Sequence, residues 1–211
     1  MRALVIDDHP LVHEIIPAVL RKALGEVAVT TEVTLEAGLA RAGGAALPDL
    51  VLLDLGLPGC EGLEAVSRFR SKFPSVPLVV LSGTCDRASI IGAFDAGAIG
   101  YIPKTSKPDV MIAALKLVAA GGTYVPPEAL EEVGKVTGPR RRRVADLDLT
   151  QRQKDVLRLI LKGYNNERIA AELAISPATV KQHAHAIFTA LGVSTRAEAV
   201  IAAARLGLSL G

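Results

Sequence analysis

Apolar residues in the first half of the chain fall into short, uninterrupted runs separated by longer segments of mixed polarity. Such runs predict strands over residues 3–6, 50–53, 77–81 and 99–102, and the more polar segment 27–33 is also expected to form a strand. Runs without alternation are typical of strands buried on both faces of a parallel sheet. The intervening segments predict helices over residues 10–24, 35–42, 61–73, 86–96 and 108–120. Five strand–helix units predict an α/β fold: a five-stranded, doubly wound parallel sheet of flavodoxin-like type with right-handed crossovers.

From residue 150 onward the pattern predicts helices only. The first of these has a capping box, in which Thr150 and Gln153 satisfy each other's backbone amides. Further polar caps predict helices that begin after Asn165 or Asn166, after Ser176, where Pro177 takes the first helical position, and after Thr195. The second part of the chain is therefore expected to be a separate, all-α domain of four helices.

The third of these helices has two distinct faces. Its apolar stripe consists of Val180, Ala184, Ile187 and Leu191. The opposite face carries Ala178, Lys181, Gln182, His185 and Thr189. Two helices joined by a tight turn, the second with a small, polar and basic outer face, are typical of a helix-turn-helix. An ordinary helical bundle would have the same periodicity, so the pattern alone leaves both interpretations open.

Polar side chains follow four of the five predicted strands in the first half. Asp7 and Asp8 follow the first strand, Asp54 the third, Ser82 the fourth and Lys104 the fifth. In a flavodoxin-like sheet these strand ends converge on one crevice. Each residue alone could be an ordinary turn or cap. Together, three carboxylates require a cation, and an all-oxygen site suits Mg²⁺.

A carboxylate beside Mg²⁺ can attack a phosphoryl group and form an aspartyl phosphate. The ammonium of Lys104 and the hydroxyl of Ser82 could then hold the phosphoryl oxygens. The crevice therefore predicts Asp54, Lys104 and Ser82 as the residues that carry the chemistry.

Charge divides the chain into two modules. Residues 1–124 carry 11 Lys and Arg against 13 Asp and Glu, a net charge of −2, whereas residues 125–211 carry 13 against 9, a net charge of +4. A basic second half favours a polyanionic partner. Residues 125–147 contain two proline turns and four consecutive arginines at 140–143, which indicates an exposed linker. We assign residues 1–124 to the sheet domain, 125–147 to the linker and 148–211 to the helical domain.

Other features narrow the class of protein. No run of 18 apolar residues is present, and acidic residues stand where a signal peptide would continue its apolar core, so a cytoplasmic protein without membrane association is expected. Cys60 and Cys85 are expected to be free thiols that flank the crevice without a redox role. His9 could be taken for a general base or a metal ligand, but no Cys or metal-spaced His pairs with it, so a loop position is favoured.

Residues 1–124 resemble a response-regulator receiver domain. The resemblance rests on the paired Asp7-Asp8, on Asp54 in LLDLGLPG, on Ser82 in VVLSG and on Lys104 in GYIPKTS. It implies that Asp54 is the phosphoacceptor and that Asp8, Asp54 and the carbonyl of Gly56 bind Mg²⁺, with Asp7 acting directly or through water. It also implies that Ser82 and Tyr101 form a switch, in which Ser82 swings to the phosphoryl oxygen and Tyr101 moves inward.

Residues 149–193 resemble the LuxR-type DNA-binding domain. The matching residues are Thr150, Arg152, Gly163, Asn166, Ile169, Ala170, Leu173, Ser176, Thr179, Val180, Lys181, His183, Leu191, Gly192 and Val193. Two positions depart from the family: Gln153 replaces a usual Glu but can still cap, and Ala190 replaces a common Lys that could contact phosphate. The DNA contacts expected on the third helix are Thr179, Lys181, Gln182, His183 and His185.

The order of the two resemblances is that of the NarL/FixJ class, which implies a two-component response regulator. We expect a partner histidine kinase to phosphorylate Asp54, the C-terminal domain to bind promoter DNA, and the phosphorylated protein to form a homodimer. The output would be binding rather than enzymatic turnover.

Two other functions compete with this interpretation. A stand-alone phosphatase of the haloacid dehalogenase type would need a second Asp at the position of Gly56. A constitutive DNA-binding protein could use its receiver only as a dimerisation scaffold, although the complete acidic site argues against it.

Overall fold

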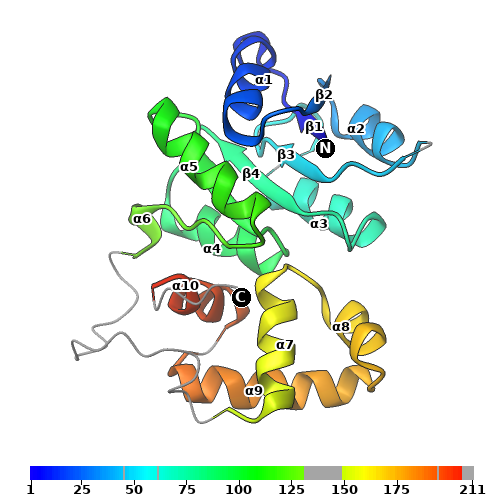
Figure 1. Cartoon of the computed structure of the whole chain (residues 1–211), viewed down its shortest axis with the longest axis vertical. Helices are drawn as coiled ribbons and strands as arrows, with labels where there is room; N and C mark the ends of the chain where they lie inside the picture. Colours follow the sequence, from blue (N-terminus) through cyan, green and yellow to red (C-terminus); the bar gives the residue numbers. More distant parts are fainter. Residues whose placement is uncertain (45, 61, 131–148, 194, 206–211) are drawn as a thin grey trace.

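The computed structural model describes residues 1–44, 46–60, 62–130, 149–193 and 195–205, which form an α/β domain and a helical domain (Figure 1). The first domain contains β1 (Arg2–Ile6), α1 (Pro10–Leu24), β2 (Ala28–Glu32), α2 (Leu35–Ala42), β3 (Leu50–Leu53), α3 (Leu63–Lys72), β4 (Leu78–Ser82), α4 (Arg87–Asp95), β5 (Gly100–Pro103) and α5 (Pro108–Ala119). A short helix, α6 (Pro127–Leu130), follows. The second domain contains α7 (Gln151–Leu161), α8 (Asn166–Leu173), α9 (Pro177–Leu191) and α10 (Arg196–Arg205).

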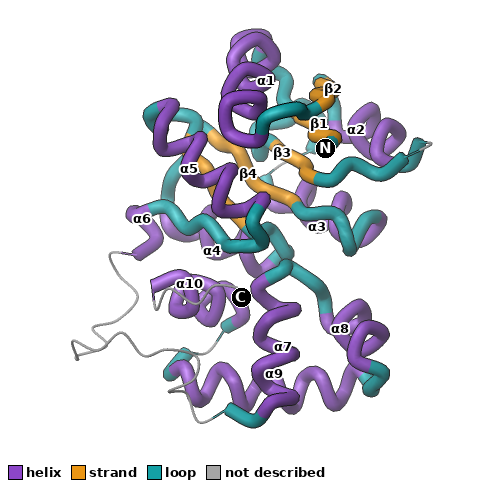
Figure 2. Tube along the Cα trace, in the orientation of Figure 1, coloured by secondary structure: helices purple, strands orange, loops and turns teal. Residues whose placement is uncertain are grey.

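The five strands form one parallel sheet in the order β2-β1-β3-β4-β5, which confirms the predicted topology. In the central strand β3, Val51 is paired with Leu4 of β1 on one side and with Leu78 of β4 on the other. All four residues of β3 are buried, because α1 and α5 cover one face of the sheet and α2, α3 and α4 cover the other (Figures 1 and 2). The carboxyl ends of β1, β3, β4 and β5 therefore meet at one edge.

Most element boundaries agree with the predictions to within one or two residues. The largest difference is at α3, which was expected from residue 61 and begins at Leu63. Gly62 precedes it with a φ of +54°, a conformation that glycine adopts readily and that ends the loop there. Most of the expected linker, including the arginines at 140–143, lies outside the described residues.

The caps predicted in the helical domain are present. Thr150 and Gln153 form the reciprocal capping box of α7, Asn165 caps α8, and the Ser176 hydroxyl accepts from the Thr179 amide at the start of α9. The turn between α8 and α9 passes through Ala174, the one residue other than glycine with positive φ in the described part of the chain. Its left-handed conformation ends α8 and lets α9 begin within three residues, as a helix-turn-helix requires.

The two domains share one apolar core. α10 packs against α4 (Figure 1), and a single cluster of buried side chains includes Ile90 and Phe94 of α4 together with Val200 and Ile201 of α10. Non-polar burial of this kind stabilises an interface without fixing its geometry. The geometry has to come from directional contacts.

Hydrogen bonds to backbone groups supply that geometry. The Asp95 carboxylate at the end of α4 accepts a 2.8 Å hydrogen bond from the amide of Ala197 in the first turn of α10, and burial raises the pKa of Asp95. Arg70 of α3 donates to the carbonyls of Val76 and Gly163, and burial lowers its pKa to about 10. The helical domain is therefore held through the first turn of α10 and the C-terminal end of α7.

The described residues contain no single helix that is both long enough and apolar enough to cross a membrane. Only α9 and α10 taken together meet those two criteria, and the pair is bent by 52° between them.

Gly163 offers a test of the domain contact. It has a φ of +77°, and a Cβ at this position would lie 2.5 Å from the Ile99 side chain and 2.8 Å from the Gly97 carbonyl, both in the other domain. Gly192 has a similar φ of +69°, but a Cβ added there would meet no atom within 4 Å. Backbone strain alone destabilises either Ala variant by about 1–2 kcal/mol. We expect Gly163→Ala also to separate the domains, raising the radius of gyration in small-angle scattering. Gly192→Ala should leave it unchanged, and identical curves for the two variants would contradict the described contact.

Candidate functional site

The residues predicted at the strand ends converge on one site. The Lys104 ammonium, just after β5, lies 2.8 Å from a carboxylate oxygen of Asp7 and 2.8 Å from Oδ2 of Asp54. Ser82, at the end of β4, lines the same hollow of about 300 Å³ as Asp54, Gly56 and Lys104. The sequence interpretation that these side chains share one crevice is therefore confirmed.

Two of the carboxylates in this site are buried, and their charges need a partner. Asp7 is 0% exposed and Asp54 is 2% exposed. A buried carboxylate without a partner is strongly destabilising, so Lys104 is required to balance the two charges. Lys104 also ties β5 to β1 and β3, since each of the two carboxylates follows one of those strands. The ion pairs thus keep this end of the sheet together.

The acidic residues also fit a divalent cation. Ligand atoms of Asp7, Asp8, His9 and Asp54 all lie within 4.8 Å of one another. Gly56 lines the hollow beside them, close enough that an added Cβ would lie 3.4 Å from the Asp54 carboxylate. Carboxylate oxygens, like backbone carbonyl oxygens, are the hard donors that Mg²⁺ prefers.

His9 belongs to this site, although the sequence interpretation favoured a loop position over a role as a metal ligand. The residue occupies the expected loop position, directly before α1, but its side chain does not cap that helix. Instead Nδ1 lies 3.1 Å from Asp7 Oδ1 and 2.9 Å from Asp8 Oδ1. The sequence signal was its position between Asp8 and Pro10, because a proline in the first turn of α1 fixes His9 as the residue before the helix.

The two predicted switch residues are linked through Thr84. The Ser82 hydroxyl accepts a 3.2 Å hydrogen bond from the Thr84 amide, and the Tyr101 hydroxyl donates a 2.6 Å hydrogen bond to the Thr84 carbonyl. Tyr101 is 0% exposed, and burial raises its pKa. The expected inward movement of Tyr101 therefore does not start from this conformation, because the ring is already inside.

Neither cysteine lines the hollow itself, although Gly62 and Thr84, their near neighbours in the sequence, do. Cys60 is buried, with its sulfur 3.9 Å from a guanidinium nitrogen of Arg68. Cys85 is partly buried, and burial, followed by the nearby Glu128, raises its pKa. A raised thiol pKa disfavours the reactive thiolate.

α9 displays the predicted outer face. Lys181, Gln182 and His185 lie on the outer side of the helix, whereas Val180 and Ile187 on the opposite stripe are buried. Lys181 and Gln182 are exposed, and His183 is partly buried, at the edge of the stripe. The receiver-like domain packs on α10 and the end of α7, so it does not bury these outer side chains.

Thr179 is already engaged in the cap of α9. Its hydroxyl lies 2.8 Å from that of Ser176, so this side chain helps to stabilise the start of the helix.

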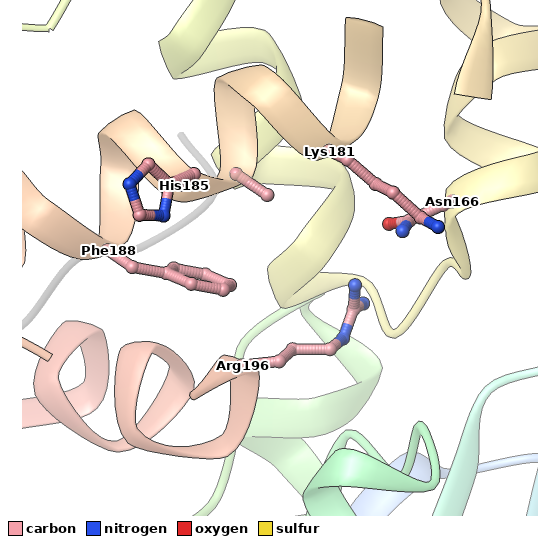
Figure 3. A pocket seen from close by; sticks show the side chains of 6 residues that line it. Asn166, Lys181, His185, Phe188 and Arg196 are labelled. Atoms are coloured by element: carbon pink, nitrogen blue, oxygen red, sulfur yellow. The ribbon is translucent and has the colours of Figure 1, made fainter. Parts of the chain in front are cut away.

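A second hollow, of about 320 Å³, lies beside this face of α9. It is lined by Asn166, Lys181, Ala184, His185, Phe188 and Arg196. In Figure 3 the Lys181 side chain extends toward Asn166, and Arg196 reaches up from α10. Arg196 donates to the carbonyls of Ile160 and Tyr164, and burial lowers its pKa to about 10. Lys181 is exposed beside this hollow, whereas the Arg196 guanidinium is committed to those two carbonyls.

Comparison with known families matches both parts of the chain. The family described as the response regulator receiver domain matches residues 3–116, and the family of bacterial regulatory proteins of the luxR type matches residues 147–203.

Whole proteins with the same arrangement are similar to this chain. The glycerol metabolism activator of Pseudomonas putida is 34% identical over 209 residues, covering 96% of this chain and 94% of that protein. The nitrate/nitrite response regulator NarL of Escherichia coli is 34% identical over 201 residues, covering 94% and 92%.

Solved structures agree with these matches. A LuxR-family two-component response regulator from Aurantimonas superposes with a TM-score of 0.57 at 29% identity, covering 63% of this chain and 94% of that one. The response regulator RcsB of Salmonella typhimurium superposes with a TM-score of 0.57 over 95% of this chain and 96% of that one. At 24% identity it supports the fold alone.

The balance of charge in the acidic site can be tested with Lys104→Met. Removing the ammonium leaves two buried carboxylates without their partner, so the free energy of unfolding should fall by about 3 kcal/mol. Added Mg²⁺ should recover part of this loss, because a cation among the carboxylates replaces the missing charge. Urea denaturation with and without Mg²⁺ measures both effects. Lys107→Met, which removes an exposed lysine nearby, is the matched control and should change little. A loss of stability that Mg²⁺ leaves untouched would contradict a cation site here.

Proposed function

The chain belongs to the response regulators with a LuxR-type DNA-binding domain, and from that membership we propose that Asp54 accepts a phosphoryl group from a partner histidine kinase to control promoter binding. One observation carries this proposal: buried Asp54 lines a hollow that Lys104 and Ser82 also line, with Lys104 2.8 Å from its carboxylate. The family is one of regulators rather than enzymes, so the chemistry is confined to the protein's own phosphorylation. The expected place of action is the cytoplasm.

The proposed reaction needs few groups. A carboxylate oxygen of Asp54 attacks the phosphorus of a phosphohistidine, the P–N bond breaks, and its electron pair leaves with the kinase imidazole. Lys104, already 2.8 Å from Asp54, and the hydroxyl of Ser82 hold the transferred phosphoryl oxygens. Asp7, Asp8, Asp54 and the Gly56 carbonyl would hold Mg²⁺, which neutralises negative charge as the phosphoryl group approaches.

The signal has a continuous physical route between the domains. If Ser82 turns to the phosphoryl group, the Thr84 amide loses its partner, and the loop before α4 must rearrange. α4 begins after Asp86 in that loop and ends at Asp95, whose carboxylate holds the amide of Ala197 in α10. A shift of α4 would therefore change the hold on α10. We propose that this loosening frees the helical domain and allows a homodimer to form on DNA.

One observation favours a second candidate function. Lys181 and Gln182 on the outer face of α9 are exposed, so constitutive DNA binding would need no unmasking of these residues. The two proposals differ in one measurable quantity, the change in DNA affinity on phosphorylation. No change would favour the constitutive regulator.

The phosphoacceptor can be tested with a small phosphodonor and intact-mass measurement. Wild-type protein should gain one phosphoryl group in the presence of Mg²⁺. Asp54→Asn should gain none, since it lacks the nucleophile. Asp8→Ala should gain less, because it loses a metal ligand. Equal labelling of the wild type and Asp54→Asn would overturn the assignment.

The reading of DNA bases can be tested on α9. The N-terminal part of a recognition helix meets base edges, so Lys181→Ala and Gln182→Ala should each remove about 1–3 kcal/mol of discrimination between the preferred and a changed sequence. Thr189→Ala, exposed two turns further along the same helix, is the control and should retain sequence preference. Gel shifts of the phosphorylated protein at matched salt concentration make the comparison. If both α9 variants discriminate as well as the wild type, this helix does not read the bases.

A further inference from the structure

We propose that His9 is a metal ligand of the acidic site, so that the site favours a later transition-metal ion such as Co²⁺ over Mg²⁺. The inference rests on the proposed function, because it concerns the same cation site. It adds a nitrogen donor to a set of ligands that is otherwise all oxygen.

The position of the imidazole is the first argument. Its Nδ1 lies 2.9 Å from Asp8 Oδ1, 3.1 Å from Asp7 Oδ1 and 3.7 Å from Asp54 Oδ2. A single nitrogen thus approaches oxygens of all three carboxylates, at the place where those oxygens converge. A cation held by the same carboxylates would come within reach of this nitrogen.

The backbone holds the ring there. The His9 amide donates a 3.0 Å hydrogen bond to Asp7 Oδ1, and its carbonyl accepts from the Val12 amide in the first turn of α1. Pro10 follows directly and restricts the chain at the start of the helix. The ring therefore stands at the rim of the site with its backbone fixed on both sides, although its side chain is 60% exposed.

A simpler interpretation is that His9 is only a counter-ion. Lys104 Nζ lies 3.2 Å from the same Nδ1 and already balances Asp7 and Asp54, so the site has an internal cation without His9. The two interpretations predict different effects of removing the ring. If His9 is a counter-ion, it competes with metal ions for the carboxylates, so its removal should strengthen the binding of every divalent cation by the same factor. Loss of a ligand weakens selectively those ions that favour nitrogen.

The chemistry of the ions gives the direction. Carboxylate, carbonyl and water oxygens suit Mg²⁺ and Mn²⁺, whereas imidazole suits the later ions of the first transition series, for which affinity rises through Fe²⁺ to Co²⁺. The ratio of Co²⁺ to Mg²⁺ affinity is therefore the sensitive quantity, and it is independent of phosphoryl transfer.

Full-length protein titrated with Co²⁺ and Mg²⁺ in separate calorimetric experiments tests the proposal, with the visible spectrum of bound Co²⁺ as a second readout. Mutation of a residue that only hydrogen-bonds to a metal ligand typically costs about 10–100-fold in metal affinity. His9→Ala removes the proposed ligand itself and should lower the ratio of Co²⁺ to Mg²⁺ affinity by about tenfold or more. His9→Asn, which offers an oxygen near the position of Nδ1, should bind both ions with the same lowered ratio. In both variants the Co²⁺ band should shift as the nitrogen ligand is lost.

His13→Gln is the matched control. The His13 ring donates to the backbone carbonyl of Asp7 rather than facing the carboxylates, so this variant should keep the wild-type ratio and spectrum. Circular dichroism verifies that each variant is folded.

Two outcomes overturn the proposal: an unchanged ratio and spectrum in His9→Ala, or tighter binding of both ions by the same factor. Failure of the wild type to bind any divalent cation is distinguishable from both, since it would refute the metal site of the proposed function itself.

Discussion

Two buried carboxylates on neighbouring strands must be balanced by a positive charge, and this requirement organises the molecule. Lys104 meets it from the end of β5, so the ion pairs join three strands at one edge of the sheet. The same requirement leaves the site receptive to a second cation, because two lysine contacts do not neutralise Asp7, Asp8 and Asp54 together. The burial of Asp7 and Asp54, their pairing with Lys104 and the capacity for a further cation thus follow from one arrangement of strand ends.

The sheet and the residues of the acidic site could be predicted because both depend on local sequence. An uninterrupted apolar run such as residues 50–53 indicates a buried strand, and parallel strands bring their carboxyl ends together. The orientation of the His9 ring could not be predicted, since it depends on how Asp7 and the start of α1 fix the backbone. The inward position of Tyr101 was also missed, because its partner is a backbone carbonyl, that of Thr84.

The domain contact was hidden from sequence reasoning for the same reason. It uses the carbonyl of Gly163, the amide of Ala197 and a close approach to Gly97. Backbone groups are present at every residue, so no side-chain pattern marks which of them will pair. Asp95 and Arg70 are the polar side chains that pair with two of these backbone groups, and each has an ordinary place in its own helix.

The attachment of α10 to α4 also has a geometric consequence for target sites. α10 packs on α9, so whatever fixes α10 fixes the direction in which the recognition helix points. Two copies that bind a duplex together must place their recognition helices about 34–36 Å apart, one turn of DNA. While the hydrogen bond between Asp95 and Ala197 persists, the distance and angle between two such helices are set by how the α/β domains pair. If the protein binds DNA as proposed, breaking the domain contact would remove this constraint, and the protein would then accept a wider range of half-site spacings.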